Sequence, residues 1–336
     1  MQIAYNVRIL IRIFSAMINR RNLLLSLAAW GLLSPTVSSA RTNKSLRIIV
    51  PYPAGGPLDA TARVVAEMLQ PLRGKVIVEN RPGAAGARGL LALKESEPDG
   101  QTLAMGAVAT LAVNPWIRDN LPYQPNDFAG VCLLSDVPNV LVMTPQTMQK
   151  LGVKTLQELL DYIRQNPGKL NAASGGNGSA GHIIGEVLSN QGYRTEHIAF
   201  AGASAAQLSV LAGETDLMFD NWASAKAAVS DGRLVALAQT VSDPDNSVPA
   251  PSLSSLGIDC DISTWFGLIA PSATPDEIRR GIFNDIEKAL LESENQQKFL
   301  LASGSTAILD SKAFDIWIAG EQKKYQMLLR ALKLTS

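Results

Sequence analysis

The sequence predicts an α/β protein with mostly parallel sheets, on three observations. Beyond residue 44, short β-branched or apolar runs alternate with segments of helical periodicity, a pattern typical of parallel strands connected by helices. Clusters of Pro, Gly and Asp separate these runs, as turns do. The chain has 336 residues, of which 46% are hydrophobic, which suits two domains with ample core.

The individual elements follow in order along the chain. Residues 44–50 predict a strand, 51–56 a tight turn, and 59–72 a helix with apolar residues at helical spacing. Residues 135–138 predict a break between two strands, and 242–255 a loop rich in Pro, Ser and Asp. The further predicted strands are residues 76–79, 101–105, 131–134, 140–143, 170–173, 197–200, 217–219, 235–240 and 265–270. One further helix is predicted to end at Lys94, one to cover 155–165 with Thr155 as its cap, and one to follow Ser179. Helices are also predicted between the strands from 197 to 240, and over residues 275–293, 295–303 and 311–332.

The first 40 residues have the character of a cleavable export signal. They contain four Arg and no acidic residue, and Arg20-Arg21 precede the uncharged run Leu23–Leu33. Ser38-Ser39-Ala40 supplies small residues for a signal peptidase, which predicts cleavage after Ala40 and a periplasmic protein. The alternative is a membrane anchor, but a run of 11 residues is shorter than the ~20 that span a bilayer core.

Two details of this signal stay open. The residues around Arg20-Arg21 loosely match a twin-arginine signal, although a general secretory signal needs only the charge. Because residues 1–16 exceed a typical signal, we expect Met17 rather than Met1 to be the start.

Charge excludes nucleic acid as a partner. Without residues 1–40 the net charge is −4, and no run of Lys or Arg offers the basic stripe that phosphates demand. The two cysteines, Cys132 and Cys260, are either two buried free thiols or, outside the cytoplasm, a disulfide.

Gly176–Gly181 matches the G-x-G-x-x-G pattern of dinucleotide-binding turns, and Glu196 lies 20 residues after Gly176. However, Glu196 precedes the next predicted strand, whereas the ribose-binding acid of that fold follows it. A Walker loop is excluded because no Gly-Lys-Ser or Gly-Lys-Thr follows these glycines. We therefore expect no nucleotide, and no other cofactor.

The glycine-rich loops at Pro53–Gly56 and Gly175–Ser179 favour an anion site instead. Each follows a predicted strand and precedes a helix, where main-chain N–H groups and the helix dipole attract an anion. Ser174 and Ser179 add hydroxyl donors and Asn177 an amide. Since neither loop contains Lys or Arg, we expect a small carboxylate held by main-chain donors. The alternative for each loop is a tight turn that needs glycine for steric reasons.

Support for catalysis is poor. The sequence has no metal-binding or serine-hydrolase motif. His182 is either a neutral hydrogen-bond donor near the site or a structural residue. Asp59 is expected to cap the first helix. Asp220, with Asn221 beside it, either recognises a ligand amine or hydroxyl or forms an Asx turn.

Six motifs then occur in a fixed order: Arg47–Asp59 (RIIVPYPAGGPLD), Val78–Gly86 (VENRPGAAG), Pro98–Gly100 (PDG), Ala173–His182 (ASGGNGSAGH), Gly213–Asn221 (GETDLMFDN) and Trp265–Pro271 (WFGLIAP). In these motifs, from about Leu46 to the C-terminus, the chain resembles the Bug-type receptors. These are the periplasmic solute-binding proteins of the tripartite tricarboxylate transporter family.

The resemblance implies a two-lobed, type II-like periplasmic binding protein that closes on its ligand, with residues 41–137 plus 265–336 as lobe 1 and 138–264 as lobe 2. It implies a small organic acid gripped between the two loops, partly through water, with Asp220 at the variable end of the ligand. Cys132 and Cys260 would lie near the two crossovers, so that a disulfide is conceivable. Membrane permease subunits are the expected partners of a monomeric receptor. The predicted ligand-binding residues are Tyr52, Pro53, Ala54, Gly55, Gly56, Asp59, Ser174, Gly176, Asn177, Gly178, Ser179, His182, Ala201 and Asp220.

Two stretches depart from the family's pattern. Residues 199–202 read Ala-Phe-Ala-Gly where the family usually has Pro-Tyr-Lys-Gly, so a hydroxyl and a cation are missing from a loop expected to face the cleft. Residues 248–253 lack the acid of the family's Val-Pro-Thr-Leu-x-Glu stretch. The identity of the ligand therefore stays open.

The sequence thus predicts a solute receptor without catalytic activity. One alternative is an exported enzyme acting on carboxylates, with His182 as base and Asp220 as its orienting acid. Another is a ligand sensor subunit for a signalling system, which would share the fold and differ in its partner.

Overall fold

The computed structural model describes residues 45–305 and 307–335. The export signal, its cleavage after Ala40 and the choice between Met1 and Met17 lie outside the described residues and stay predictions. Within the described ranges, no helix is both long and apolar enough to cross a bilayer.

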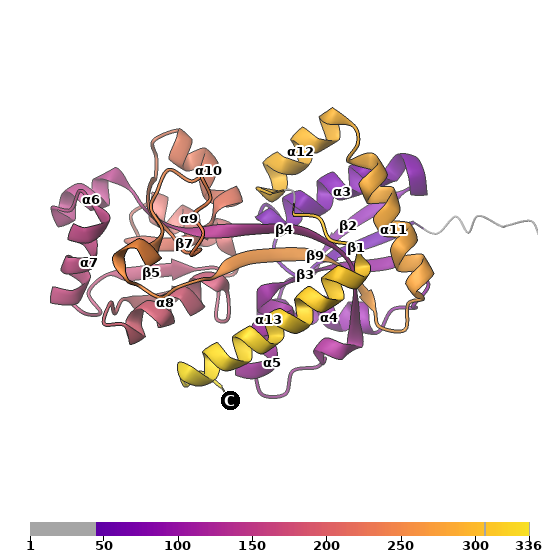
Figure 1. The fold of residues 1–336 in the computed structure, drawn as a ribbon, viewed down its shortest axis with the longest axis horizontal. Coiled ribbons are helices and arrows are strands. Elements are labelled where there is room, and N and C mark those ends of the chain that lie inside the picture. The colour runs from indigo at the N-terminus through magenta and orange to yellow at the C-terminus, as the bar shows by residue number, and fades with distance from the viewer. Residues whose placement is uncertain (1–44, 306, 336) are drawn as a thin grey trace, which may run out of the picture. The chain divides into compact units, whose positions relative to one another are not determined.

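Two strands, β4 (Phe128–Met143) and β9 (Ser263–Pro271), lie at the centre of the sheet. They pair antiparallel, from Phe128 opposite Pro271 to Pro138 opposite Ser263. Figure 1 shows them side by side, running between two groups of strands. Both strands are buried along almost their whole length.

Parallel strands flank this central pair on both sides. The strand order is β2-β1-β3-β9-β4-β7-β5-β6, and β8 also pairs with β4. The first group consists of β1 (Leu46–Val50), β2 (Val76–Asn80) and β3 (Thr102–Ala107). The second group consists of β5 (Asn171–Ser174), β6 (Glu196–Ala199), β7 (Leu217–Asn221) and β8 (Val235–Gln239). Among the described strands, every antiparallel pairing involves β4 or β9, and the others are parallel. The predicted α/β class is confirmed.

Helices connect most of the parallel strands and pack on the sheet (Figure 1). The α-helices are α3 (Pro57–Arg73), α4 (Ala87–Lys94), α5 (Asn114–Ile117), α6 (Pro145–Leu151), α7 (Leu156–Gln165), α8 (Ala180–Asn190), α9 (Ala203–Leu211), α10 (Trp222–Ser230), α11 (Asp276–Ala289), α12 (Ser293–Ser303) and α13 (Ser311–Ala331). The short helical turns are η1 (Ala84–Gly86), η2 (Ala109–Val113), η3 (Pro125–Asp127) and η4 (Leu253–Leu256).

The predicted break at residues 135–138 is wrong, because these residues continue β4. They pair with residues 263–266 of β9, and a long-range partner overrides the local turn signal. Pro138 has no N–H to donate, but it is the last residue of β4 that pairs with β9, so the ladder loses little there.

Two helical segments are absent from the sequence-based prediction. The η2–α5 segment (residues 109–117) contains a five-residue π-helix buried on all sides, so its sequence shows no amphipathic period. Helix α6 has only seven residues, and its cap, the hydroxyl of Thr144, accepts a hydrogen bond from the Thr147 amide at 3.0 Å.

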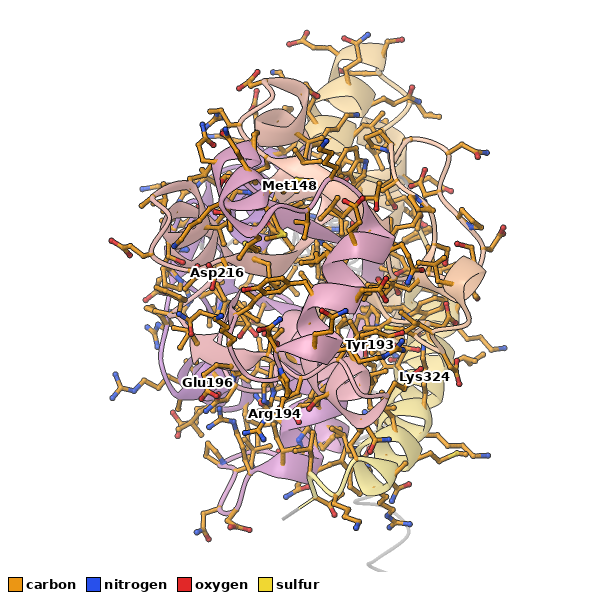
Figure 2. All side chains as sticks on the ribbon, turned by 90° about the vertical axis from the view of Figure 1, so that its left-hand side faces the viewer. Met148, Tyr193, Arg194, Glu196, Asp216 and Lys324 are labelled. Atoms are coloured by element: carbon orange, nitrogen blue, oxygen red, sulfur yellow. The ribbon has the colours of Figure 1, made fainter. Side chains whose placement is uncertain are left out.

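The second group of strands has a packed outer layer, seen in Figure 2 from the side that lies at the left of Figure 1. Leu156, Leu159, Leu160 and Ile163 form the buried stripe of α7. Thr155 caps this helix by accepting from the Glu158 amide at 3.2 Å, which confirms the prediction. In the last turn of α7, the Arg164 guanidinium lies 4.6 Å from the centre of the Tyr193 ring, an attractive cation–π contact.

Both cysteines are buried free thiols. Burial raises the pKa of Cys260 to about 12 and that of Cys132 well above its usual range. The alternative of a Cys132–Cys260 disulfide is therefore not realised in the structure.

The β4–β9 pair generates a first prediction. A Cβ at Gly267 of β9 would lie 2.3 Å from the Cys132 carbonyl oxygen and 2.7 Å from the Phe314 ring of α13. Gly267→Ala should therefore overpack the core and lower the free energy of unfolding by about 1–3 kcal/mol or more. Gly320→Ala, at an exposed position of α13 with no atom within 4 Å of the new methyl, should instead raise the free energy of unfolding by up to about 1 kcal/mol. Urea unfolding of both variants measures the difference, and equal stability of the two would contradict the close packing at Gly267.

Candidate functional site

Helix N-termini from both groups of strands meet at one cavity of about 330 Å³. Four helix starts contribute to its lining: Gly56–Asp59 (α3), Ser179–Gly181 (α8), Gly202–Ala205 (α9) and Asp220–Asn221 (before α10). The strands that precede these helices, β1, β5, β6 and β7, all end towards them, as ligand-binding edges of α/β sheets do. The amides of a first helical turn have no acceptor within their own helix, so the cavity is rich in main-chain donors.

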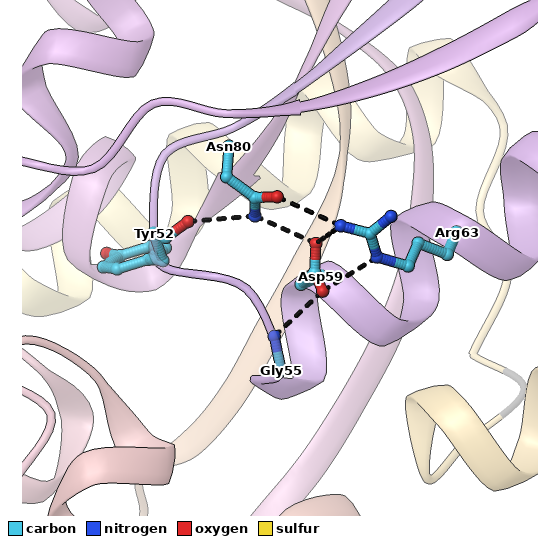
Figure 3. A network of polar contacts seen from close by, with 5 residues as sticks. All are labelled: Tyr52, Gly55, Asp59, Arg63 and Asn80. Atoms are coloured by element: carbon cyan, nitrogen blue, oxygen red, sulfur yellow. Dashed lines mark hydrogen bonds and ion pairs between the residues drawn. The ribbon is translucent and has the colours of Figure 1, made fainter.

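A hydrogen-bond network fixes the loop before α3 (Figure 3). The Asp59 carboxylate accepts from the Gly55 amide at 2.9 Å, from Arg63 at 2.9 and 3.0 Å, and from Asn80 at 2.9 Å. Asn80 also donates to the Tyr52 carbonyl at 3.1 Å. Burial alone would raise the pKa of Asp59, but the bonds from Arg63, Gly55 and Asn80 outweigh it and lower that pKa.

Asp59 is not the cap residue that the sequence suggests. The N-cap of α3 is Gly56, followed by Pro57 at the first helical position. Asp59 lies in the first turn, and its carboxylate accepts from the Gly55 amide. This bond stabilises the turn at Gly55, whose positive φ of +90° glycine adopts without strain.

Nearby side chains accept from two glycine amides of the loop before α8. Ser174 Oγ accepts from the Gly176 amide at 3.1 Å, and His182 Nδ1 accepts from the Gly178 amide at 3.1 Å. Ser179 caps α8 by accepting from the His182 amide at 3.3 Å. Two donors that the sequence offers to an anion are therefore used within the loop.

His182 lies beside the second histidine. The two ring centres, of His182 and His197, are 4.3 Å apart, and His197 Nε2 lies 2.6 Å from Ser174 Oγ. Burial lowers the pKa of both imidazoles. Because Nδ1 of His182 accepts a hydrogen bond, this nitrogen carries no proton, which favours the structural alternative for His182.

The start of α9 lies against both glycine-rich loops. A Cβ at Gly175 would be 3.2 Å from the Ala203 amide, and Ser204 Oγ donates to the Gly55 carbonyl at 2.9 Å. The N-cap is Gly202, which has no side chain to signal a helix start. The sequence signal for this helix start is the run of small, helix-compatible residues that follows Gly202.

Asp220 ends β7 as a buried carboxyl with neutral partners. It accepts from the Gln207 side chain at 2.7 Å and from the Asn221 amide at 2.8 Å, and it is 1% exposed. Burial, opposed by these bonds and one with Ser224, raises the pKa of Asp220 to about 7. Asn221 caps α10 by accepting from the Ala223 amide at 2.8 Å.

The cavity contains part of the predicted site. Its lining includes Tyr52, Pro53, Ala54, Gly56, Asp59, Ser179, Ala201 and Asp220. Six predicted residues do not line it: Gly55, Ser174, Gly176, Asn177, Gly178 and His182. The lining also includes Asn221, which the sequence singled out beside Asp220. Lining residues that the sequence did not single out include Leu58, Ala107, Val108, Ala109, Asn139, Ala203, Ser204, Ala205, Leu208, Met218, Phe219 and Thr264. Most of these come from helix starts and strand ends that only the fold brings together.

No group of three or more His, Cys, Asp or Glu side chains in the described part of the chain is placed to hold a metal ion. The two carboxyls of the cavity lining have different surroundings: Asp59 is paired with Arg63, whereas Asp220 has no cationic partner among the described residues.

Comparison with known proteins gives a consistent result. The family model described as "Tripartite tricarboxylate transporter family receptor" matches residues 61–334. The protein BugT of Bordetella pertussis is 31% identical over 289 residues, which cover 84% of this chain and 87% of BugT. A solved structure of a periplasmic transporter is 29% identical with a TM-score of 0.80, covering 88% of this chain and 99% of that one. MatC from Rhodopseudomonas palustris, solved with bound malate, is 25% identical with a TM-score of 0.76, covering 85% and 98%.

The environment of Asp220 predicts a specific pH dependence. Its carboxyl titrates near pH 3.8 in the unfolded chain and near pH 7 in the fold. Between these values the folded protein holds a proton that the unfolded chain has lost, so this group lowers stability as pH rises from about 4 to about 7. Asp220→Asn should remove this part of the pH dependence.

Urea unfolding across this pH range, on wild type and variant, measures the effect. Asp231→Asn is the matched control, because Asp231 is exposed and pairs with Arg233 at the surface. Parallel stability profiles for wild type and Asp220→Asn would show that Asp220 does not titrate in this range.

Proposed function

The chain belongs to the tripartite tricarboxylate transporter receptor family, and on that premise we propose that it captures a small carboxylate-bearing organic acid for a tripartite membrane transporter. The family consists of solute-binding receptors and not of enzymes. What we propose is the class of ligand, the groups that hold it and its delivery to the transporter.

The convergence of the α3, α8 and α9 N-termini on one cavity carries the proposal. Each start presents first-turn amides and the positive end of a helix dipole, and both favour an anion. Among the lining residues there is no Lys, Arg or His, so the amides are the available counterpart for a negative charge. MatC, a similar protein, has malate bound, and a carboxylate cargo is in line with that.

The proposed capture uses two lobes, residues 41–137 plus 265–336 and residues 138–264. The register of β4 supports this division, because β4 pairs with β9 up to Pro138 and with β7 from Asn139 onwards. The bond from Ser204 to Gly55 joins the two proposed lobes at the cavity. Lobe closure around a ligand is a common hinge mechanism.

The proposal also includes the cellular setting. The protein would be exported, lose residues 1–40, act as a monomer in the periplasm and present its loaded form to membrane permease subunits. A sensor for a signalling system would use the same cavity and differ in the partner alone.

The enzyme alternative receives no support from the cavity. His182, its presumed base, does not line the cavity, and its Nδ1 accepts the Gly178 amide. No imidazole that could act as a base therefore lines the space in which a substrate would lie.

A proline scan of the helix starts tests the amide grip. Proline fits the first helical position and removes one N–H donor. Ala180 and Ala203 are the first residues of α8 and α9, and both follow extended caps, Ser179 and Gly202, that tolerate a following proline. Ala180→Pro and Ala203→Pro should each weaken carboxylate binding ~10- to 100-fold, because a hydrogen bond to a charged group contributes about 1.5–3 kcal/mol.

The measurement is isothermal titration of the mature chain with the carboxylate that gives the largest thermal shift in a panel of acids and their amides. A ligand at about 100 times its Kd should add ~2.7 kcal/mol of stability. Ser293→Pro is the control, since it makes the same change at the exposed start of α12. Stabilisation by the amides but not the acids would refute the proposal, and so would unaltered binding in both α8 and α9 variants.

A further inference from the structure

One polar group in the cavity has no partner. Asn221 is 6% exposed; its Oδ1 caps α10, but its Nδ2 has no hydrogen-bond partner. Asn221 is the one cavity-lining residue among the described side chains with such an orphaned buried atom. A buried donor without an acceptor is costly and calls for an explanation, and a ligand oxygen in the cavity would supply the acceptor.

The surroundings place this donor beside the helix starts. Asn221 ends β7 two residues after Phe219, and a Cβ at Gly181 in the first turn of α8 would lie 2.7 Å from the Phe219 carbonyl oxygen. Asn221 Nδ2 can only donate, as can the first-turn amides of α8. These two kinds of donor suit an acceptor-only head such as a carboxylate and not an ammonium group.

The rest of the cavity does not suit a second charge. Its wall consists largely of apolar side chains, among them Leu58, Val108, Leu208, Met218 and Phe219. Of its two acids, Asp59 is neutralised by Arg63 and Asp220 has neutral partners alone. A second carboxylate would therefore be buried next to apolar groups or next to Asp220, without a cation.

We propose that the cavity takes a monocarboxylate with an uncharged, apolar body, and that Asn221 Nδ2 donates to its carboxylate. This inference rests on the proposed function, and it narrows the cargo from organic acids in general to one class. Leu208, which lies in the second half of α9, is 65% exposed and lines the cavity, would contact the body of the ligand at the cavity's open side.

Three six-carbon probes test the ligand class by titration calorimetry: hexanoate, adipate and 6-aminohexanoate. The expected result is hexanoate binding at least ~10-fold tighter than the other two. Adipate binding as tightly as hexanoate would overturn the apolar-body inference and leave the carboxylate receptor intact. Tighter binding of 6-aminohexanoate would overturn it as well. If none of the acids binds and hexylamine does, the proposed function itself fails.

Two Asn221 variants test the donor. Asn221→Asp and Asn221→Ser both keep a side-chain oxygen that can cap α10, but each lacks the amide donor. Both should lose hexanoate affinity by ~10-fold or more while circular dichroism and the melting temperature without ligand show a folded protein. Undiminished hexanoate binding by a folded Asn221→Asp, whose ionised carboxylate can only accept, would overturn the role of Asn221.

A third experiment changes the preference of the cavity instead of weakening its binding. Leu208→Lys would add a cation at the cavity's exposed wall and should bring adipate affinity up to or above that of hexanoate. Leu301→Lys is the matched control, because Leu301 on α12 is 77% exposed and does not line the cavity. An unchanged preference in Leu208→Lys would show that charge at this wall does not decide the choice of acid.

Discussion

The antiparallel pairing of β4 with β9 is the constraint on which the rest of the structure depends. Every strand of the first group joins the sheet through β9, and the second group joins it through β4. The close approach at Gly267, where a Cβ would strike the Cys132 carbonyl and the Phe314 ring, shows how tightly this pair is packed under α13. Since the pair fixes where both groups of strands end, it also fixes where their helices begin.

The site follows from that placement. Helix starts from both groups meet at the same cavity, and the first-turn amides of each are left without intrahelical acceptors. The lining has no Lys, Arg or His, so the positive potential at these helix starts comes from backbone amides and helix dipoles. Glycine and alanine at these starts leave the backbone accessible from the cavity.

Two carboxyls at the cavity show how neighbours set the role of one residue type. Asp59 receives four hydrogen bonds from Gly55, Arg63 and Asn80, stays ionised and shapes the loop before α3. Asp220 is more deeply buried, has neutral donors alone and titrates near neutral pH. The first stabilises the loop before α3, and the second is a buried carboxyl whose donors are all neutral.

The sequence by itself determined the α/β class, most helices and strands, the cap at Thr155 and the two glycine-rich loops, because each depends on neighbours within a few residues. Local signals failed at residues 135–138, where a distant partner strand completes β4. They also could not reveal that Ser174 and His182 use the amides of Gly176 and Gly178, or that the α9 start and Asn221 face the same cavity as α3. Only the tertiary structure decided these points, since a hydrogen-bonding group's partner, or its lack of one, depends on which distant segments the sheet brings beside it.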